Sequence, residues 1–191
     1  MIPTFVASTG TSVRLVPARW AKWLVALALL AVSLAFGVPL ARDFAARTSV
    51  AAGADALLEA FHLARSEALV RKVSVTICKT ANTQAPLPAC AGSAAEWPQG
   101  WVVFVDQGTI GVVDAFDKVI ARGRPLGAID VEERPTRLAS VTFNPVGPIA
   151  GPASTLEVHI TSPLSRGSFE RVICLSLLGR AHVSKSGGCQ A

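Results

Sequence analysis

The feature that most constrains this chain is an uncharged stretch of 19 residues, residues 23–41, between Lys22 and Arg42. As an α-helix, this stretch spans roughly 28 Å, about the thickness of the hydrocarbon core of a bilayer. Trp20 and Trp23 stand at its start, where membrane proteins often carry interfacial tryptophans. The stretch therefore predicts a transmembrane helix.

Basic residues at the two ends of this stretch indicate its orientation. Arg19 and Lys22 precede it and Arg42 follows it, and the positive excess on the N-terminal side favours a cytoplasmic N-terminus. The alternative is a cleaved secretory signal, although the apolar core of a signal is usually about 7 to 15 residues long. The chain thus divides into a cytoplasmic flank, a transmembrane segment and an exported domain, residues 1–22, 23–41 and 42–191.

The exported part contains four cysteines, Cys78, Cys90, Cys174 and Cys189. An even number of cysteines in a translocated domain predicts disulfides. Three pairings are possible. We favour Cys78–Cys90 with Cys174–Cys189, because each bond would tie the end of a strand to a flexible neighbour, and each closed loop would stabilise the fold by about 3 kcal/mol. A zinc site is disfavoured because no C-x-x-C motif is present and the histidines are scattered.

The exported part begins with a helical pattern over residues 44–72. Apolar residues recur there at steps of three and four, which predicts a helix that continues from the span and packs one stripe on a sheet. The apolar stripe consists of Val50, Ala54, Leu57, Phe61, Ala64 and Ala68. A second stripe with the same spacing is predicted to face water, and it consists of Asp55, Glu59, His62 and Ser66.

After Lys72 the pattern predicts only strands, separated by segments rich in glycine and proline. The expected strands are residues 73–78, 101–105, 118–122, 139–143, 156–161, 172–177 and 180–184. Trp97 and Trp101 are expected to close the core, and His159 is expected on the polar face of its strand. One long helix followed by strands predicts an α+β fold in which the helix packs on antiparallel sheets.

The sequence predicts no catalytic residue, no metal site and no cofactor. No serine stands in a G-x-S-x-G turn, and no P-loop or paired-carboxylate motif is present. Asp106, Asp114 and Asp117 lie in a glycine-containing loop that faintly resembles a calcium loop. Ile110 and Val112 occupy the inner positions of that loop, where calcium would need oxygen ligands. We therefore do not expect an enzyme.

Five short motifs resemble GspH/FimT-type minor pseudopilins, which are pilin-like proteins of type II secretion systems and type IV pili. The motifs are LARSEA at 63–68, VTIC at 75–78, WPQGWVVFVD at 97–106, VTFNPVG at 141–147 and LGR at 178–180. The resemblance extends over residues 50–189. It implies a pilin-like fold, in which the first half of a long N-terminal helix is transmembrane and the second half packs on antiparallel β-sheets.

The resemblance also implies a location and partners. The chain would cross the inner membrane once and place residues 42–191 in the periplasm as a pilin-like domain. Its partners would be the inner membrane and other pilin or pseudopilin subunits, which it would join through its N-terminal helix. A structural role in assembly is the leading hypothesis for its function.

The chain departs from the family at the prepilin peptidase site. Family members open with a glycine, then a phenylalanine, and a glutamate four residues further on. When Pro39 is aligned with the proline late in the pilin span, Pro17, Ala18 and Lys22 fall at these positions. None of the three matches, so the motif for cleavage by this peptidase is missing. Lysine also reverses the charge of the glutamate, which in the family is expected to meet the amino terminus of a neighbouring pilin. The resemblance therefore implies either a divergent tip component or a pilin-like domain that stays fixed in the membrane.

DNA capture is the alternative hypothesis, because the last strand resembles that of FimT-like DNA-binding minor pilins. Arg180 would be the main phosphate contact, and His182 and Lys185 would assist. In a regular strand Arg180 and His182 point to one face and Lys185 to the other. Such a site would bind DNA weakly.

Peptide mapping under non-reducing conditions is expected to recover Cys78–Cys90 and Cys174–Cys189 as the two bonded pairs. The second bond would hold the C-terminus, which otherwise frays. A peptide that joins Cys78 to Cys174 would contradict this pairing and would make their two strands neighbours.

Overall fold

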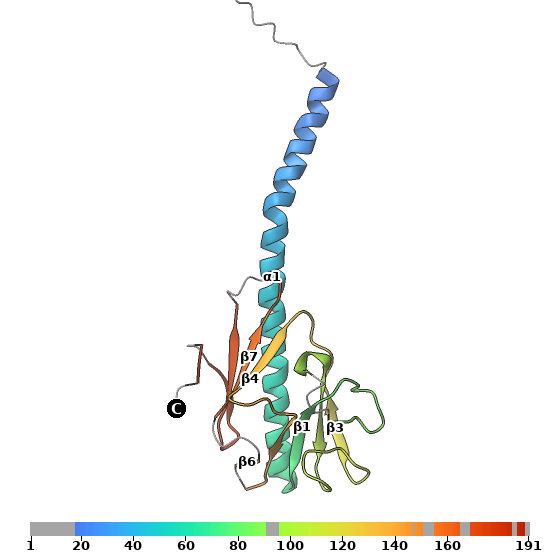
Figure 1. The fold of residues 1–191 in the computed structure, drawn as a ribbon, viewed down its shortest axis with the longest axis vertical. Coiled ribbons are helices and arrows are strands. Elements are labelled where there is room, and N and C mark those ends of the chain that lie inside the picture. Colours follow the sequence, from blue (N-terminus) through green and yellow to red (C-terminus); the bar gives the residue numbers. More distant parts are fainter. Residues whose placement is uncertain are drawn as a thin grey trace, which may run out of the picture. The chain divides into compact units, whose positions relative to one another are not determined.

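The computed structural model describes residues 18–90, 96–146, 148–150, 155–164, 169–184 and 187–189 (Figure 1). The chain divides into two units at Ala41 and Arg42. In chain order the elements are α1 (Ala18–Arg71), β1 (Val75–Lys79), the 3₁₀ helix η1 (Trp97–Gln99), β2 (Trp101–Val105), β3 (Lys118–Arg122), β4 (Asp130–Arg134), β5 (Ser140–Phe143), β6 (Ile149–Ala150), β7 (Leu156–Thr161), β8 (Arg171–Leu175) and β9 (Ala181–Ser184).

Helix α1 contains both the apolar stretch and the amphipathic segment that follows it. In the second unit every residue of the predicted apolar stripe, from Val50 to Ala68, is buried. Every residue of the second stripe is exposed. The helix ends at Arg71, and Lys72 then takes a left-handed conformation with φ of 57°, which commonly terminates a helix. The prediction for residues 44–72 is confirmed.

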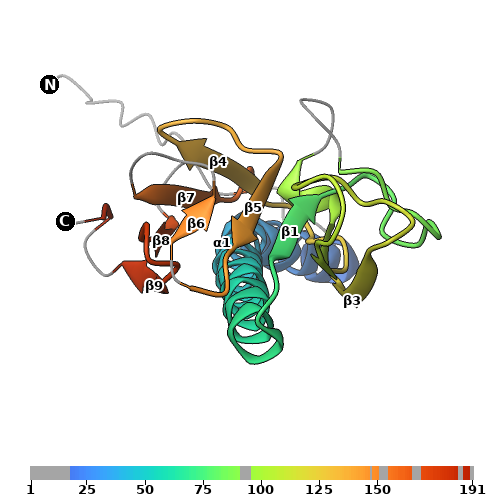
Figure 2. The same cartoon turned by 90° about the horizontal axis from the view of Figure 1, so that it is seen from below.

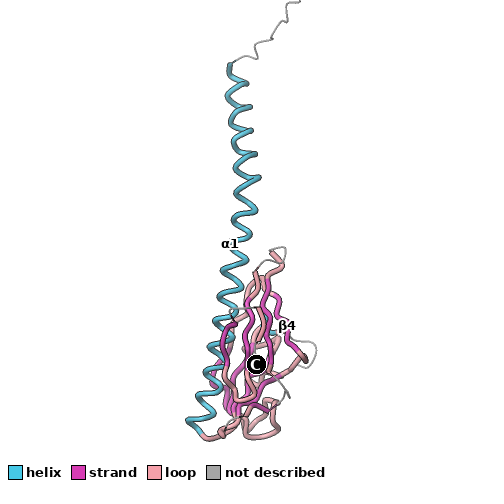
Figure 3. The backbone as a smooth tube through the Cα atoms, turned by 90° about the vertical axis from the view of Figure 1, so that its left-hand side faces the viewer, coloured by secondary structure: helices cyan, strands magenta, loops and turns pink. Residues whose placement is uncertain are grey.

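The strands form two antiparallel sheets. The five-stranded sheet has the order β3-β2-β1-β5-β6, and the four-stranded sheet has the order β4-β7-β8-β9. Figure 2 shows β4, β7, β8 and β9 on one side of α1 and β1 and β3 on the other, and Figure 3 shows the strands alongside the second half of the helix. The predicted α+β class, a long helix packed on antiparallel sheets, is confirmed.

Strands β4 and β6 were not predicted from the sequence. β6 has only two residues. β4 has the sequence DVEER, in which four of five residues are charged, although its burial alternates with a period of two. Val131 and Glu133 face the core while Asp130, Glu132 and Arg134 face solvent. The strand was missed because Glu133 occupies a core-facing position, and such a position is expected to be apolar.

The central strand β1 is buried on both of its faces. Val75 and Ile77 belong to the core that includes the apolar stripe of α1. On the other face lies a second cluster of Cys78, Val102 and Phe104, packed against Cys90, Val113 and Val119. The segments 80–90 and 106–117 therefore cover the outer face of the five-stranded sheet.

A buried ion pair connects the two sheets. Lys79 of β1 places its Nζ 3.2 Å from Oε2 of Glu133 in β4, and these residues are 3% and 5% exposed. The indole Nε1 of Trp97 donates to Oε1 of Glu133 at 2.6 Å, and the backbone N–H of Leu138 donates to Oε2 at 3.3 Å. Trp97 in turn meets the ring of Phe61 of α1 edge-on, with centroids 6.0 Å apart. Trp97 and Trp101 are buried, which confirms that they close the core.

Glu133→Gln is expected to lower the free energy of unfolding by about 3–5 kcal/mol, because it leaves the buried Lys79 ammonium without a counter-charge. Glutamine keeps a carbonyl oxygen that can accept the hydrogen bond from the indole of Trp97. The substitution therefore tests the effect of the negative charge alone. The measurement is chemical unfolding of the full chain in detergent micelles.

Glu132→Gln is the matched control for this prediction, since Glu132 is the neighbouring residue on the exposed face of β4. It should leave stability nearly unchanged. Adding Lys79→Met to Glu133→Gln should recover part of the loss. Equal stability of the Glu133 and Glu132 variants would contradict the importance of the buried pair.

Candidate functional site

The apolar half of α1 is bare within the described part of the chain. Side chains from Trp20 to Ala41 are all exposed, and the most apolar 18-residue window of the helix is 0% buried. The hydroxyl of Ser33 donates to the carbonyl oxygen of Leu29 at 2.8 Å, so it leaves no unpaired donor on this surface. Among the described residues, α1 alone is long and apolar enough to cross a membrane.

Charged residues bound this apolar surface, as the sequence indicates. Lys22 and Arg42 are exposed. The side chain of Arg19 lies outside the described part of the structure. Pro39 lies inside α1, near the end of the apolar stretch.

The four cysteines form the two bonds that the sequence favours. Cys78 is bonded to Cys90 with Cα atoms 5.4 Å apart, and Cys174 is bonded to Cys189 with Cα atoms 5.6 Å apart. The first bond fastens the segment 80–90 to β1. The second fastens the C-terminal segment to β8.

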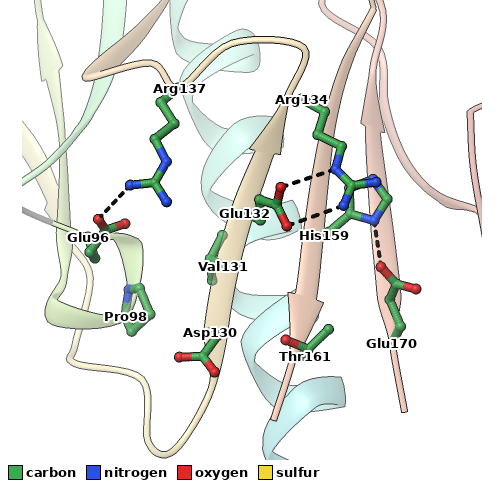
Figure 4. A pocket seen from close by; sticks show the side chains of 10 residues that line it. All are labelled: Glu96, Pro98, Asp130, Val131, Glu132, Arg134, Arg137, His159, Thr161 and Glu170. Atoms are coloured by element: carbon green, nitrogen blue, oxygen red, sulfur yellow. Dashed lines mark hydrogen bonds and ion pairs between the residues drawn. The ribbon is translucent and has the colours of Figure 1, made fainter. Parts of the chain in front are cut away.

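A half-open groove of about 490 Å³ lies on the outer face of the four-stranded sheet. Figure 4 shows that charged side chains line it and that most of them meet in pairs. Arg137 contacts Glu96 at 3.4 Å, and Arg134 binds Glu132 through two nitrogens at 3.2 and 3.3 Å. No three His, Cys, Asp or Glu side chains in the described residues could together hold a metal ion. The groove is therefore lined by charges that largely neutralise one another.

His159 is the most enclosed polar side chain of this face. Its Nδ1 lies 2.5 Å from Oε1 of Glu170, and its Nε2 lies 3.1 Å from Oε2 of Glu157. The His159 side chain is 7% exposed, against 27% for Glu157 and 44% for Glu170. The other oxygen of Glu157 accepts a hydrogen bond from the backbone N–H of Cys189 at 2.9 Å. His159 thus lies on the polar face of β7, as expected, but it is buried between two carboxylates.

Two carboxylates of this face have lowered pKa values. The pKa of Glu132 is lowered by the hydrogen bonds and the charge of Arg134. The pKa of Glu157 is lowered mainly by the N–H of Cys189 and then by the His159 side chain. Because a lowered pKa keeps a carboxylate ionised, the bond from Glu157 to Cys189 persists until the pH falls through the pKa of Glu157 in the folded protein.

The residues proposed for DNA lie at and after the β8–β9 turn. Gly179 has φ of 72°, and a Cβ atom there would lie 3.2 Å from the Phe143 ring, so this turn requires glycine. Arg180 and His182 are exposed, and His182 pairs with Cys174 on the face that also carries Glu157. Lys185 lies outside the described residues. The structure thus brings Arg180 and His182 near each other, but on a face rich in carboxylates.

His62 makes a contact that its position in the water-facing stripe did not predict. Its Nε2 lies 2.9 Å from the carbonyl oxygen of Ala181. This contact joins α1 to the edge strand β9. The sequence could not indicate this contact, because it depends on the tertiary fold, which places β9 beside α1.

The aspartates of the 106–117 loop accept hydrogen bonds from backbone N–H groups and from one threonine hydroxyl. Asp106 Oδ2 accepts bonds from the Thr76 hydroxyl at 2.6 Å and the Gly111 N–H at 2.8 Å. Asp117 accepts the N–H groups of Gln107 and Asp114, each at 2.8 Å. These bonds hold the loop over the five-stranded sheet.

Comparison with known proteins agrees with this architecture. A family model described as "Type II transport protein GspH" matches residues 53–179. Two crystal structures of the type IV minor pilin FimU from Pseudomonas aeruginosa share the fold. One is 17% identical, with a TM-score of 0.57, and covers 74% of this chain and 92% of the FimU chain. The other is 16% identical, with a TM-score of 0.53, and covers 72% and 94%. No curated protein matches the sequence.

The chain belongs to the GspH family of pilin-like proteins. This family is structural and is not known for catalysis. The fold is that of a minor pilin, with a long N-terminal helix against antiparallel sheets. The family assignment confirms the resemblance that the sequence motifs indicate.

Proposed function

We propose that this protein is a minor pilin-type subunit that assembles, through its N-terminal helix, with other pilin or pseudopilin subunits of a type II secretion system or a type IV pilus. The observation that carries this proposal is the bare apolar half of α1. The apolar stripe of the second half of the same helix is packed against the sheets. The bare half is therefore available for lipid and for neighbouring subunits.

Physical chemistry supports membrane insertion of the bare half. Trp23, Leu27, Leu30 and Phe36 are each more than half exposed, and burying one such side chain is worth about 1.5–3 kcal/mol. An α-helix satisfies its own backbone hydrogen bonds, which a bilayer core requires. Residues 23–41 would then cross the inner membrane, with residues 1–22 in the cytoplasm.

Two further observations support a periplasmic location for residues 42–191. The two disulfides suit an oxidising compartment. The basic residues before the span favour a cytoplasmic N-terminus.

The paired charges of the groove suit a surface with a structural role rather than a catalytic one.

The full-length chain is expected to fractionate with the inner membrane and to require detergent for release. Leu30→Arg should weaken membrane insertion, because an arginine at the centre of a span costs about 2.5–3.5 kcal/mol. Ser66→Arg is the matched control, since it places the same charge on the exposed stripe of the packed half of α1. The intact mass of the membrane protein would separate a retained anchor from a cleaved signal. Recovery of the full-length chain in the soluble fraction would contradict anchoring.

A second candidate function is weak DNA capture at the β8–β9 turn. Arg180 is exposed, and its guanidinium makes no hydrogen bond or ion pair with the described residues, so it is available to a phosphate. Glu157, which lies in register with Cys174 and His182 on this face, opposes a polyanion. The surface charge therefore favours the structural role over this one.

Arg180→Gln is expected to weaken binding of duplex DNA without unfolding the protein, in gel shifts of the full chain in detergent. With two or three phosphate contacts, the logarithm of the binding constant should fall against log salt with a slope of roughly −2 to −3. Arg124→Gln is the control, because Arg124 is an exposed arginine of the β3–β4 connection. Absence of a shift at low ionic strength, or equal curves for the two variants, would leave only the structural role.

A further inference from the structure

The outer face of the four-stranded sheet holds one histidine between two carboxylates, and this arrangement requires a particular protonation state. A neutral imidazole carries one N–H, whereas an ionised carboxylate only accepts hydrogen bonds. Both nitrogens of His159 face carboxylate oxygens, at 2.5 and 3.1 Å. Only the doubly protonated ring donates to both, so loss of a proton turns a lone pair toward one carboxylate.

We propose that Glu157, His159 and Glu170 form a pH-dependent clamp that holds the C-terminal segment and the start of β8 against the sheet while His159 is doubly protonated. Because the His159 side chain is 7% exposed, water can hardly replace a lost contact. An unpaired polar atom in such a site is costly.

The clamp connects segments that are distant in sequence. Glu157 holds the backbone N–H of Cys189 at 2.9 Å, and Cys189 is bonded to Cys174 of β8. Glu170 is adjacent to Phe169, and the guanidinium of Arg47 in α1 lies 3.9 Å from the centroid of that ring. The imidazole therefore links the C-terminal segment, β7 and a contact to α1.

The charged groups around His159 come from each neighbouring element of the sheet. β7 contributes Glu157, the residues before β8 contribute Glu170, and β4 contributes Glu132 directly opposite His159. Arg134, also in β4, binds Glu132. The opposite neighbour in β8 is the apolar Val172. Three carboxylates and one guanidinium thus surround the ring, which balances a positive charge on it.

The clamp should open on both sides of a pH window. As the pH rises, His159 loses a proton and one carboxylate contact with it. As the pH falls, Glu157 becomes protonated, but only below its ordinary range because its pKa is lowered. The clamp is therefore closed only while the ring is doubly protonated and Glu157 is ionised.

Hydrogen exchange of the full chain in detergent micelles tests this proposal across pH 5.5 to 8.5, with rates corrected for intrinsic exchange. Protection of β7, of the residues at the start of β8 and of Cys189 should fall together by roughly tenfold as the pH rises, which corresponds to one charge-assisted hydrogen bond. β1 and β2 serve as internal references and should not respond.

Three variants separate the clamp from a general effect of pH. His159→Gln should remove the pH response and leave protection low throughout. Glu170→Gln should also remove it, and because Glu170 is 44% exposed, this variant keeps the test decisive if His159→Gln fails to fold. His182→Gln changes an exposed histidine and should retain the wild-type response. A flat wild-type profile, or a response retained in the His159 and Glu170 variants, would overturn the clamp.

Discussion

The ion pair between Lys79 and Glu133 is the contact on which the rest of the globular unit depends. It joins the central strand of one sheet to the edge strand of the other, in a place where neither charge reaches water. Trp97 donates to the same carboxylate and also packs on Phe61 of α1. The carboxylate of Glu133 therefore links the two sheets directly, and it links them to α1 through Trp97. A buried pair of this kind is weak evidence of extra stability compared with an apolar core. Its value here lies in geometry, since it fixes how the two sheets face each other.

Much of the architecture could be predicted from the sequence, because it rests on local periodicity. The stripe from Val50 to Ala68 predicted the buried face of α1, and alternation predicted most strands. The favoured disulfide pairs rest on the same pattern, because each joins the end of a predicted strand to a flexible neighbour. Strand β4 escaped prediction because Glu133 breaks the apolar alternation that marks a core face. Its partner Lys79 is 54 residues away, and no local pattern indicates a contact at that separation.

The candidate site was predicted less completely, for the same reason. Alternation placed His159, Arg180 and His182 on exposed or polar faces. It did not indicate that Glu170, which lies just before β8, would reach one ring nitrogen of His159 while Glu157 reaches the other. The polar stripe of α1 likewise predicted a solvated His62, whereas its Nε2 contacts the backbone carbonyl of Ala181 in β9. Such contacts depend on which strands become neighbours, and strand order is a property of the whole fold.

The order of the strands has a consequence for how the unit can reach its folded state. β4 lies between β3 and β5 in the chain, but it belongs to the other sheet. Neither sheet can therefore be completed from one continuous piece of chain, and most of their contacts join residues far apart in sequence. Folds dominated by such contacts have high contact order and fold slowly. A chain with this topology would thus expose strand edges during folding for longer than a helical protein of equal length. Helix α1 shares its core with strands of both sheets, so its apolar stripe offers a surface on which these strands can gather.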